Sequence, residues 1–198
     1  MIHLIQSREL FGPSERQAEL LTCWRKTDEQ GLFDASTHPE GRPTVSEMLA
    51  MFHQDAINVL GNSDMYYDAD FVRQVTAYYS RAGTEFVAMA LSRYDIAVDG
   101  TATHWNHCDS MDTWITKGVP QGIDVPWPLG TPGIDNRLAW ALQQAGYVVI
   151  NPSFTIRTFH LHQCDYRSYL VDESGNGRGG HKMFRIPPPY AMVHPCEL

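Results

Sequence analysis

Carboxylate and imidazole side chains stand at a few positions where their spacing could serve metal binding. Asp64 ends the triplet Asn62-Ser63-Asp64 directly after an apolar run, and His160 and His162 stand two positions apart in an extended run. Residues two apart on a strand point to the same face, so both imidazoles can reach one ion. Carboxylate oxygens hold Mg²⁺ and Mn²⁺, and imidazole binds many transition metals. We therefore predict Asp64, His162 and His160 as metal ligands, the ordinary alternatives being a polar turn and a hydrogen-bonded histidine pair.

Asp135 is the second chemical feature. It follows the glycine- and proline-rich run from Leu129 to Gly133 and begins an amphipathic pattern. A carboxylate held in place can take the proton from an attacking hydroxyl group, so Asp135 is the candidate general base. An aspartate at the start of a helix can instead cap the free backbone N–H groups.

Asp109 and Asp112, with Trp114 close by in the sequence, form a further acidic group. Asp112 is a second catalytic candidate. A tryptophan beside carboxylates suits the face of a sugar, so we expect Asp109 and Trp114 to contact an acceptor. The alternative for Trp114 is a place in the hydrophobic core.

Two other histidines compete for a metal. His104 and His107 are followed by Cys108, a spacing that could serve zinc if the loop bends suitably, although no second half with matching spacing follows. This pattern leaves open a zinc hydrolase built on His104, His107, His160 and His162.

The elements that must position these residues follow from the apolar periodicity. In the first half strands alternate with helices, and the strands are expected at 2–6, 56–61 and 85–92. Helices are expected to begin at Pro13, Thr44 and Asp68. This order predicts an α/β sheet with parallel members, in which ligands bind beyond the carboxyl ends of the strands. The Asn62-Ser63-Asp64 triplet falls at such an end.

The helix starts carry their own signals. Ser14 with Gln17, and Thr44 with Glu47, have the spacing of a capping box. We expect the inner face of the first helix to hold Ala18, Leu21 and Trp24 or Arg25. We expect that of the second to hold Val45, Met48, Leu49 and Phe52, and that of the third Phe71, Val72, Val75 and Tyr78 or Tyr79.

The second half is less regular. We expect a loop over 94–111, a short strand over 112–116, a broken loop over 118–133, a helix over 135–145, and strands over 147–150 and 155–161. The chain is predicted to be one domain over 1–198. Its parts are a first half at 1–92, a second half at 93–170, and a tail or lid at 171–198.

Composition sets the broad class. The 198 residues are 43% hydrophobic with 11% aromatic, typical of an ordered globular protein. Fifteen basic against 23 acidic residues give a net charge of −8, which disfavours a protein that holds nucleic acid by its phosphates. The four cysteines show no CxxC spacing, and no apolar run approaches the length of a membrane span. We expect a soluble, cytoplasmic protein with reduced thiols.

Taken together, these segments resemble a small bacterial or phage glycosyltransferase of the GT-A type, which uses nucleotide-diphosphate sugars. The resemblance covers roughly residues 42–169. The matching pieces are Arg42-Pro43-Thr44-Val45-Ser46, Gly61-Asn62-Ser63-Asp64-Met65, Ala90-Leu91-Ser92-Arg93, Asp109-Ser110-Met111-Asp112-Thr113-Trp114, Gly133-Ile134-Asp135-Asn136-Arg137, and Asn151-Pro152-Ser153 through His160-Leu161-His162.

The resemblance implies a single-domain GT-A-like mixed sheet, mostly parallel and flanked by helices. It implies a nucleotide- and metal-binding half at 1–92 and an acceptor and catalytic half at 93–170. The nucleotide-sugar donor would bind near Arg42, Asn62 and Arg93. Mn²⁺ or Mg²⁺ would be held by Asp64 and a late histidine, best matched by His162 with His160 as the substitute. By position, Asp135 matches the base of an inverting enzyme.

Two points stay open. The metal motif begins with Asn62 where the family has Asp, which keeps alive a GT-A-like binding module without catalytic activity. The acceptor is compatible with a saccharide, a lipid-linked glycan, a small metabolite or a modified base in phage DNA.

Overall fold

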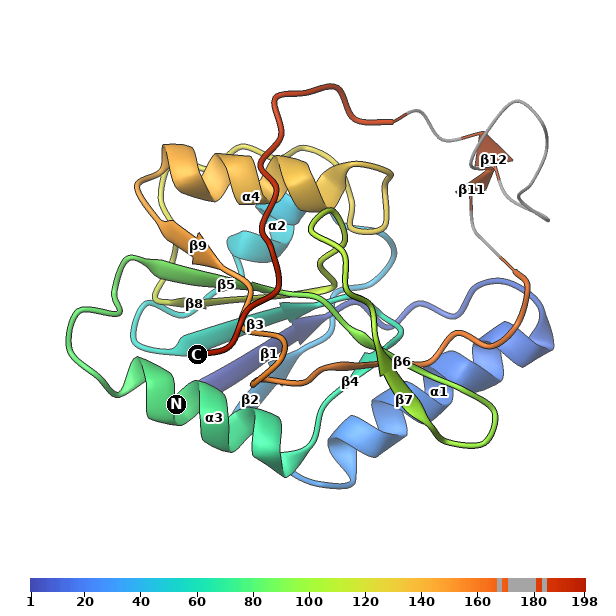
Figure 1. Ribbon diagram of the computed structural model, residues 1–198. Coiled ribbons are helices and arrows are strands. Elements are labelled where there is room, and N and C mark those ends of the chain that lie inside the picture. Colours follow the sequence, from blue (N-terminus) through green and yellow to red (C-terminus); the bar gives the residue numbers. More distant parts are fainter. Residues whose placement is uncertain (167–168, 171–180, 183–184) are drawn as a thin grey trace.

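A computed structural model of the chain describes residues 1–166, 169–170, 181–182 and 185–198. At its centre lies a mixed six-stranded sheet with the order β2-β1-β3-β8-β5-β9 (Figure 1). β8 runs antiparallel to both of its neighbours, whereas β2, β1 and β3 are parallel to one another and β5 is parallel to β9. The strands are β1 (Ile2–Gln6), β2 (Ala35–Thr37), β3 (Ile57–Gly61), β5 (Val87–Leu91), β8 (Thr113–Lys117) and β9 (Val148–Ile150). The predicted α/β class with a mixed, mostly parallel sheet is confirmed.

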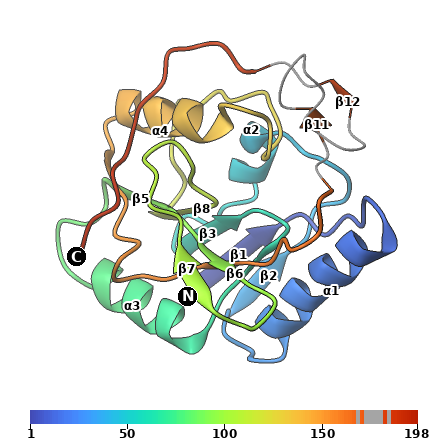
Figure 2. The same ribbon diagram turned by 45° about the vertical axis from the view of Figure 1, so that its right-hand side comes forward.

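Helices cover both faces of this sheet. α1 (Ser14–Asp28) and α3 (Ala69–Tyr79) lie on one side, and α2 (Val45–Leu49) and α4 (Ile134–Gln144) lie on the other (Figures 1 and 2). The described helices are too short or too polar to cross a bilayer.

Strand alternation explains how one sheet serves two helical layers. Leu60, Ala90 and Trp114 point into the core that contains α2 and α4. Their sequence neighbours Val59 and Ile115 point into the core that contains α3. Successive side chains of a strand face opposite sides, so an uninterrupted apolar run is buried on both faces.

Capping explains where α2 and α3 begin. The Thr44 side chain accepts from the backbone N–H of Glu47, and the Glu47 carboxylate accepts from the backbone N–H of Thr44, which is the predicted capping box. Asp68 caps α3 by accepting from Phe71 N. α4 begins differently, because Gly133 is its N-cap, at a φ of 87° and without a side-chain cap. Asp135 is therefore inside the first turn of α4 and is not its cap.

The expectations for α1 were wrong in two respects. Its N-cap is Pro13 and no side chain caps it, so the Ser14/Gln17 capping box does not form. Ala18 and Leu21 are exposed, and the buried stripe is Arg16, Leu20, Cys23, Trp24 and Thr27. This stripe begins with a charged residue and ends with a polar one, so the apolar periodicity pointed to a different face.

A second, four-stranded sheet lies beyond the carboxyl ends of β3 and β5 and has the order β4-β10-β6-β7. It consists of β4 (Met65–Tyr66), β6 (Tyr94–Ile96), β7 (Ala102–His104) and β10 (Phe159–His160). The expected loop over 94–111 thus contains a hairpin, and the expected strand over 155–161 is reduced to two residues. β10 pairs with β4, which sets His160 opposite Met65 and beside Asp64.

Part of the expected tail or lid at 171–198 is described. Residues 171–180 and 183–184 lie outside the described part of the chain, while β11 (Tyr169–Leu170) pairs with β12 (His181–Lys182). Residues 185–198 run back across α4 (Figure 1). Backbone N–H groups of this segment donate hydrogen bonds to the carbonyls of Pro132, Asn136, Cys108 and Asn151. The side chains of Ile186 and Val193 are buried in the core. This last segment is packed against the body of the protein.

Candidate functional site

A cavity of about 830 Å³ opens at the ends of β1 and β3 and beneath the start of α4. Its walls come from segments far apart in the sequence: the residues after β1, the turn after β3, the segment before β8, the 128–135 loop and the 160–166 segment. Nine of the ten predicted site residues line it, namely Arg42, Asn62, Asp64, Arg93, Asp109, Asp112, Asp135, His160 and His162. Trp114 is the exception, because its side chain lies in the core, 3% exposed.

The turn that carries Asp64 is held from three sides. The Gln6 side chain donates to the carbonyls of Asn62 and Met65, and the Trp24 indole donates to the carbonyl of Ser63. The backbone N–H of Leu161 donates to the carbonyl of Asp64. These bonds fix the direction of the Asp64 side chain into the cavity.

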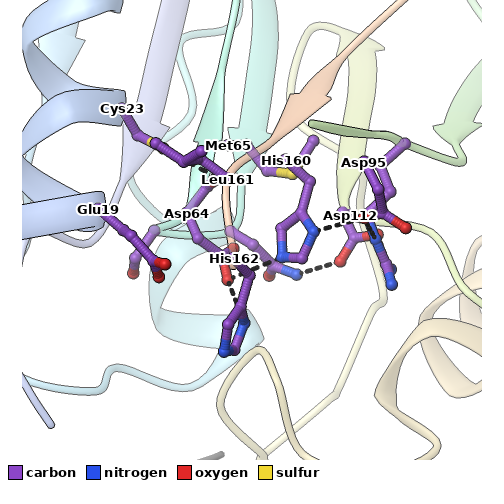
Figure 3. Close-up of polar contacts among 12 residues, drawn as sticks. Glu19, Cys23, Asp64, Met65, Asp95, Asp112, His160, Leu161 and His162 are labelled. Atoms are coloured by element: carbon purple, nitrogen blue, oxygen red, sulfur yellow. Dashed lines mark hydrogen bonds and ion pairs between the residues drawn. The ribbon is translucent and has the colours of Figure 1, made fainter. Parts of the chain in front are cut away.

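Both predicted histidines face Asp64. His160 Nε2 is 3.1 Å and His162 Nδ1 is 3.8 Å from the same carboxylate oxygen, Oδ2 (Figure 3). The ligand atoms of the three residues all lie within 4.8 Å of one another. This places the carboxylate and the two imidazoles that the sequence predicted as metal ligands around one point.

The outer nitrogen of each histidine is bonded to an oxygen acceptor. His160 Nδ1 lies 2.7 Å from Asp95 Oδ1, and His162 Nε2 lies 2.6 Å from the carbonyl of Tyr166. A carboxylate and a carbonyl only accept hydrogen bonds, so each outer nitrogen carries a proton. Histidines that ligate metals are oriented in this way, with the outer N–H on a carboxylate or a backbone carbonyl and the inner nitrogen facing the ion.

Charges around Asp64 are balanced by neighbouring cations. Burial alone would raise the pKa of Asp64, but the charges of His160 and Arg16 hold it far below its usual range. Burial opposes the charged form of His160, yet Asp64 and Asp95 together raise its pKa to about 9. His160 is therefore an imidazolium at neutral pH, and a metal ion at this point would take the place of its proton.

This donor set could hold a divalent transition metal ion, because imidazole nitrogens suit such ions. One carboxylate oxygen and two imidazole nitrogens leave positions for oxygens of a ligand. A second group, Glu19 with His162 and Cys164, is also close enough to share an ion. Glu19 already accepts from the backbone N–H groups of Gln163 and Cys164 and from Arg16, so its oxygens hold the 161–164 segment in place.

Asp112 and Arg93 form the neighbouring part of the floor. Arg93 donates to Asp95 Oδ1 at 2.8 Å and to Asp112 Oδ2 at 2.7 Å, and the Asn62 amide donates to Asp112 Oδ1 at 2.7 Å. The guanidinium of Arg93 also bonds Ser110. A chain of ion pairs and hydrogen bonds thus runs from Asp112, whose charge acts on Asp135, through Arg93 to His160. Arg93 and Asn62, which were expected to bind the donor, have hydrogen-bond partners inside the protein.

Asp135 lines the same cavity from the first turn of α4 and is partly buried. Burial raises its pKa well above the ordinary value, and the nearby charge of Asp112 adds to the effect, against a smaller lowering by Arg93 and by the N–H of Met111. A carboxylate that holds a proton more tightly than usual is a stronger base once ionised.

The competing histidine cluster is not assembled. His104 Nε2 bonds Ser153 Oγ at 2.9 Å, and its ring packs against Tyr94 and Phe154. Among the described residues, neither group that could hold a metal includes His104 or His107.

Sequence reasoning missed four residues of this site. Arg16 and Glu19 come from α1, Asp95 from β6, and Trp105 follows β7. Trp105 lines the cavity where Trp114 was expected, with its ring stacked on His107 and near the Arg93 guanidinium. The sequence held one signal for Arg16, its place at helical spacing from Leu20 and Cys23.

No protein-family model matches the sequence, and a search of curated proteins finds no match. A function must therefore be inferred from the arrangement of the site.

Proposed function

We propose that this protein is a metal-dependent glycosyltransferase that moves a sugar from a nucleotide-diphosphate sugar to a hydroxyl group of an acceptor. One observation carries the proposal. Two histidines with anchored outer nitrogens face the Asp64 carboxylate, and the same cavity holds Asp135, whose pKa is raised. A cation site and a base in one cavity are what such a reaction requires.

The donor would bind on the Asp64 side. Asp64, His160 and His162 would hold a divalent cation, which would supply positive charge to neutralise the leaving diphosphate. Asp95 and the Tyr166 carbonyl keep the two imidazoles turned toward this point. Arg42 lies exposed at the cavity wall beside the Leu129 carbonyl, where its guanidinium can contact an entering phosphate.

The acceptor would bind on the Asp135 side. Asp135 would take the proton of the attacking hydroxyl as its oxygen bonds the anomeric carbon and the bond to the diphosphate breaks. One carboxylate on the acceptor side supports a single in-line displacement, and a single displacement inverts the anomeric configuration. The cavity volume of about 830 Å³ is within the usual range for a site that encloses a small-molecule ligand.

The fold is compatible with this proposal. The structure contains a mixed α/β sheet, with the turn that carries Asp64 at the end of β3, and the proposal requires such a sheet. Ligands of α/β sheets bind outside the carboxyl ends of the parallel strands, and the cavity lies there.

The test is a thermal-shift panel of UDP, GDP, ADP and CDP, each with and without Mn²⁺. A ligand at 100 times its Kd stabilises the folded state by about 2.7 kcal/mol. The nucleotide that raises Tm only in the presence of Mn²⁺ therefore identifies the donor class. We expect Asp64→Ala to abolish this metal-dependent part. Asp55→Ala, at an exposed position outside the cavity, is the matched control.

Two results would contradict the proposal. If metal titration of Asp64→Ala matches the wild type, the metal site lies elsewhere. If the purified protein holds stoichiometric zinc and responds to none of the four nucleotides, a hydrolase becomes the better assignment.

A further inference from the structure

Arg16 is a buried arginine in direct contact with the candidate metal ligand. Its side chain is 2% exposed and lines the cavity from the first turn of α1. Nη2 of Arg16 donates to Asp64 Oδ2. Nη1 donates to Glu19 Oε2 at 2.9 Å and to the Leu161 carbonyl at 3.0 Å. Nothing in the proposed reaction has so far used this cation.

The position of Arg16 conflicts with a metal ion. His160 and His162 both face Asp64 Oδ2, and this is the oxygen that Arg16 also occupies. A dication at this point would meet the guanidinium across one shared oxygen, where the local dielectric is low and repulsion between like charges is strong. Metal and Arg16 therefore compete for Asp64.

Arg16 can change partner without leaving its place. The Nη1 bonds to Glu19 and Leu161 do not involve Asp64, so they can persist while Nη2 exchanges its partner. The Nη2–Nε edge has donors to spare: among the described residues, Nε is buried without a hydrogen-bond partner. The ring of Phe11, another cavity-lining residue, lies near the guanidinium carbon at 5.7 Å.

A displaced Arg16 needs a new anion, because an arginine buried without one is strongly destabilising. The diphosphate of the donor arrives together with the metal and binds in the same cavity. The planar Nη2–Nε edge of a guanidinium can donate two parallel hydrogen bonds to two phosphate oxygens.

We propose that Arg16 is an exchangeable cation: it neutralises Asp64 in the free protein and moves onto the diphosphate when the metal takes its place. The inference rests on the proposed function for the identity of the anion. Its consequence is that Mn²⁺ alone binds weakly, and that Mn²⁺ and a nucleoside diphosphate strengthen each other's binding, by the reciprocal coupling that links two ligands.

The experiment measures Mn²⁺ binding by the EPR signal of the free ion, and binding of UDP, GDP, ADP and CDP by calorimetry at saturating Mn²⁺. Arg16→Gln removes the charge and keeps a hydrogen-bond donor. Arg16→Lys keeps the charge but lacks the planar edge. Arg25→Gln, on the exposed side of the same helix, is the matched control.

In Arg16→Gln we expect the affinity for Mn²⁺ alone to rise about tenfold or more, and the affinity for the responding nucleotide to fall by a similar factor, as is typical of coupled sites. Arg16→Lys should leave Mn²⁺ binding near the wild-type value and weaken only the nucleotide. Arg25→Gln should change neither. If Arg16→Gln does not fold, Arg16→Lys tests the proposal. Unchanged Mn²⁺ affinity together with weaker nucleotide affinity supports it, and any other combination contradicts it.

Unchanged or weaker Mn²⁺ binding by folded Arg16→Gln would overturn the proposal, as would a parallel loss of both affinities, which marks a purely structural arginine. Equal tightening of Mn²⁺ binding in the Gln and Lys variants would also refute competition by charge. If no variant binds any of the nucleotides while Mn²⁺ behaves as expected, the proposed function and the diphosphate role both fall, and competition between Arg16 and metal stands.

Discussion

The substitution Asp135→Asn separates a catalytic from a structural role, because the two predict opposite changes in stability. Gly133 is the N-cap of α4, so the helix start does not depend on Asp135. The Met111 N–H that reaches the Asp135 carboxylate can bond the amide oxygen of Asn equally well. The substitution therefore removes the charge and leaves the shape and the hydrogen bond.

The sign of the stability change follows from the raised pKa of Asp135. Asp135 binds its proton more tightly in the folded than in the unfolded state. The free energy of unfolding of the protein therefore falls as pH rises above 3.8, the ordinary pKa of the carboxyl group, and stops falling once the pH passes the raised pKa. Each unit by which the pKa is raised corresponds to about 1.36 kcal/mol. Asn does not ionise, so Asp135→Asn should be more stable than the wild type at neutral pH, and the difference should shrink toward pH 4.

The rate should change in the opposite direction. Loss of a general base costs about 10²- to 10⁴-fold, or roughly 2.7 to 5.4 kcal/mol of transition-state stabilisation. Donor affinity should be nearly unchanged, since the role is confined to the acceptor side.

The assay compares urea unfolding between pH 5 and 8, transfer rate, and affinity for the responding nucleotide. Asp124→Asn, at an exposed position outside the cavity, controls for the loss of one negative charge. A lower free energy of unfolding with a proportionate loss of activity would show that Asp135 is structural. Near-normal turnover would remove it from catalysis.

Three further predictions test other parts of the site. Asp95→Asn should weaken Mn²⁺ binding about 10- to 100-fold in EPR titrations, because it removes the carboxylate partner of His160, a proposed metal ligand. The exposed Asp99→Asn should not weaken it, and equal Mn²⁺ affinity of the two variants would refute the metal assignment. The wild-type transfer rate should rise with pH through the raised pKa of Asp135 and then level, and a flat profile would contradict a carboxylate base. Gly61→Ala should destabilise by about 1–3 kcal/mol in urea melts, because its Cβ would lie 2.0 Å from the buried Tyr67 hydroxyl; Tyr67→Phe in the same chain should restore part of the loss, and an additive double variant would exclude this clash.

The sequence predicted the local parts of this protein well. Thr44 with Glu47 and the apolar spacing of Phe71, Val75 and Tyr79 determine helices by contacts within a few residues, and these predictions are confirmed. The strands at 2–6 and 56–61 are apolar on both faces, which only burial between two helical layers satisfies, so the α/β class also followed from the chain.

Predictions failed where a side chain's environment depends on distant segments. Arg16 stands at helical spacing from Leu20 and Cys23, but it can be buried only because Asp64 and Glu19, which come together in the fold, neutralise its charge. Trp114 was expected beside an acceptor, yet β8 alternates its side chains between two cores and sends this ring into one of them. The hairpin of β6 and β7 was missed because its strands are three residues long and too short to show a period.

The sequence alone determined which residue types are available for chemistry: one carboxylate after a buried strand, two late histidines and one aspartate at a helix start. Only the tertiary structure decided that they meet. The pairing of β10 with β4 brings His160 to Asp64 across 96 positions of sequence, and Asp95 on the next strand fixes the orientation of its ring. Such pairings are set by the burial and hydrogen bonding of whole sheets, which no local pattern in the chain encodes.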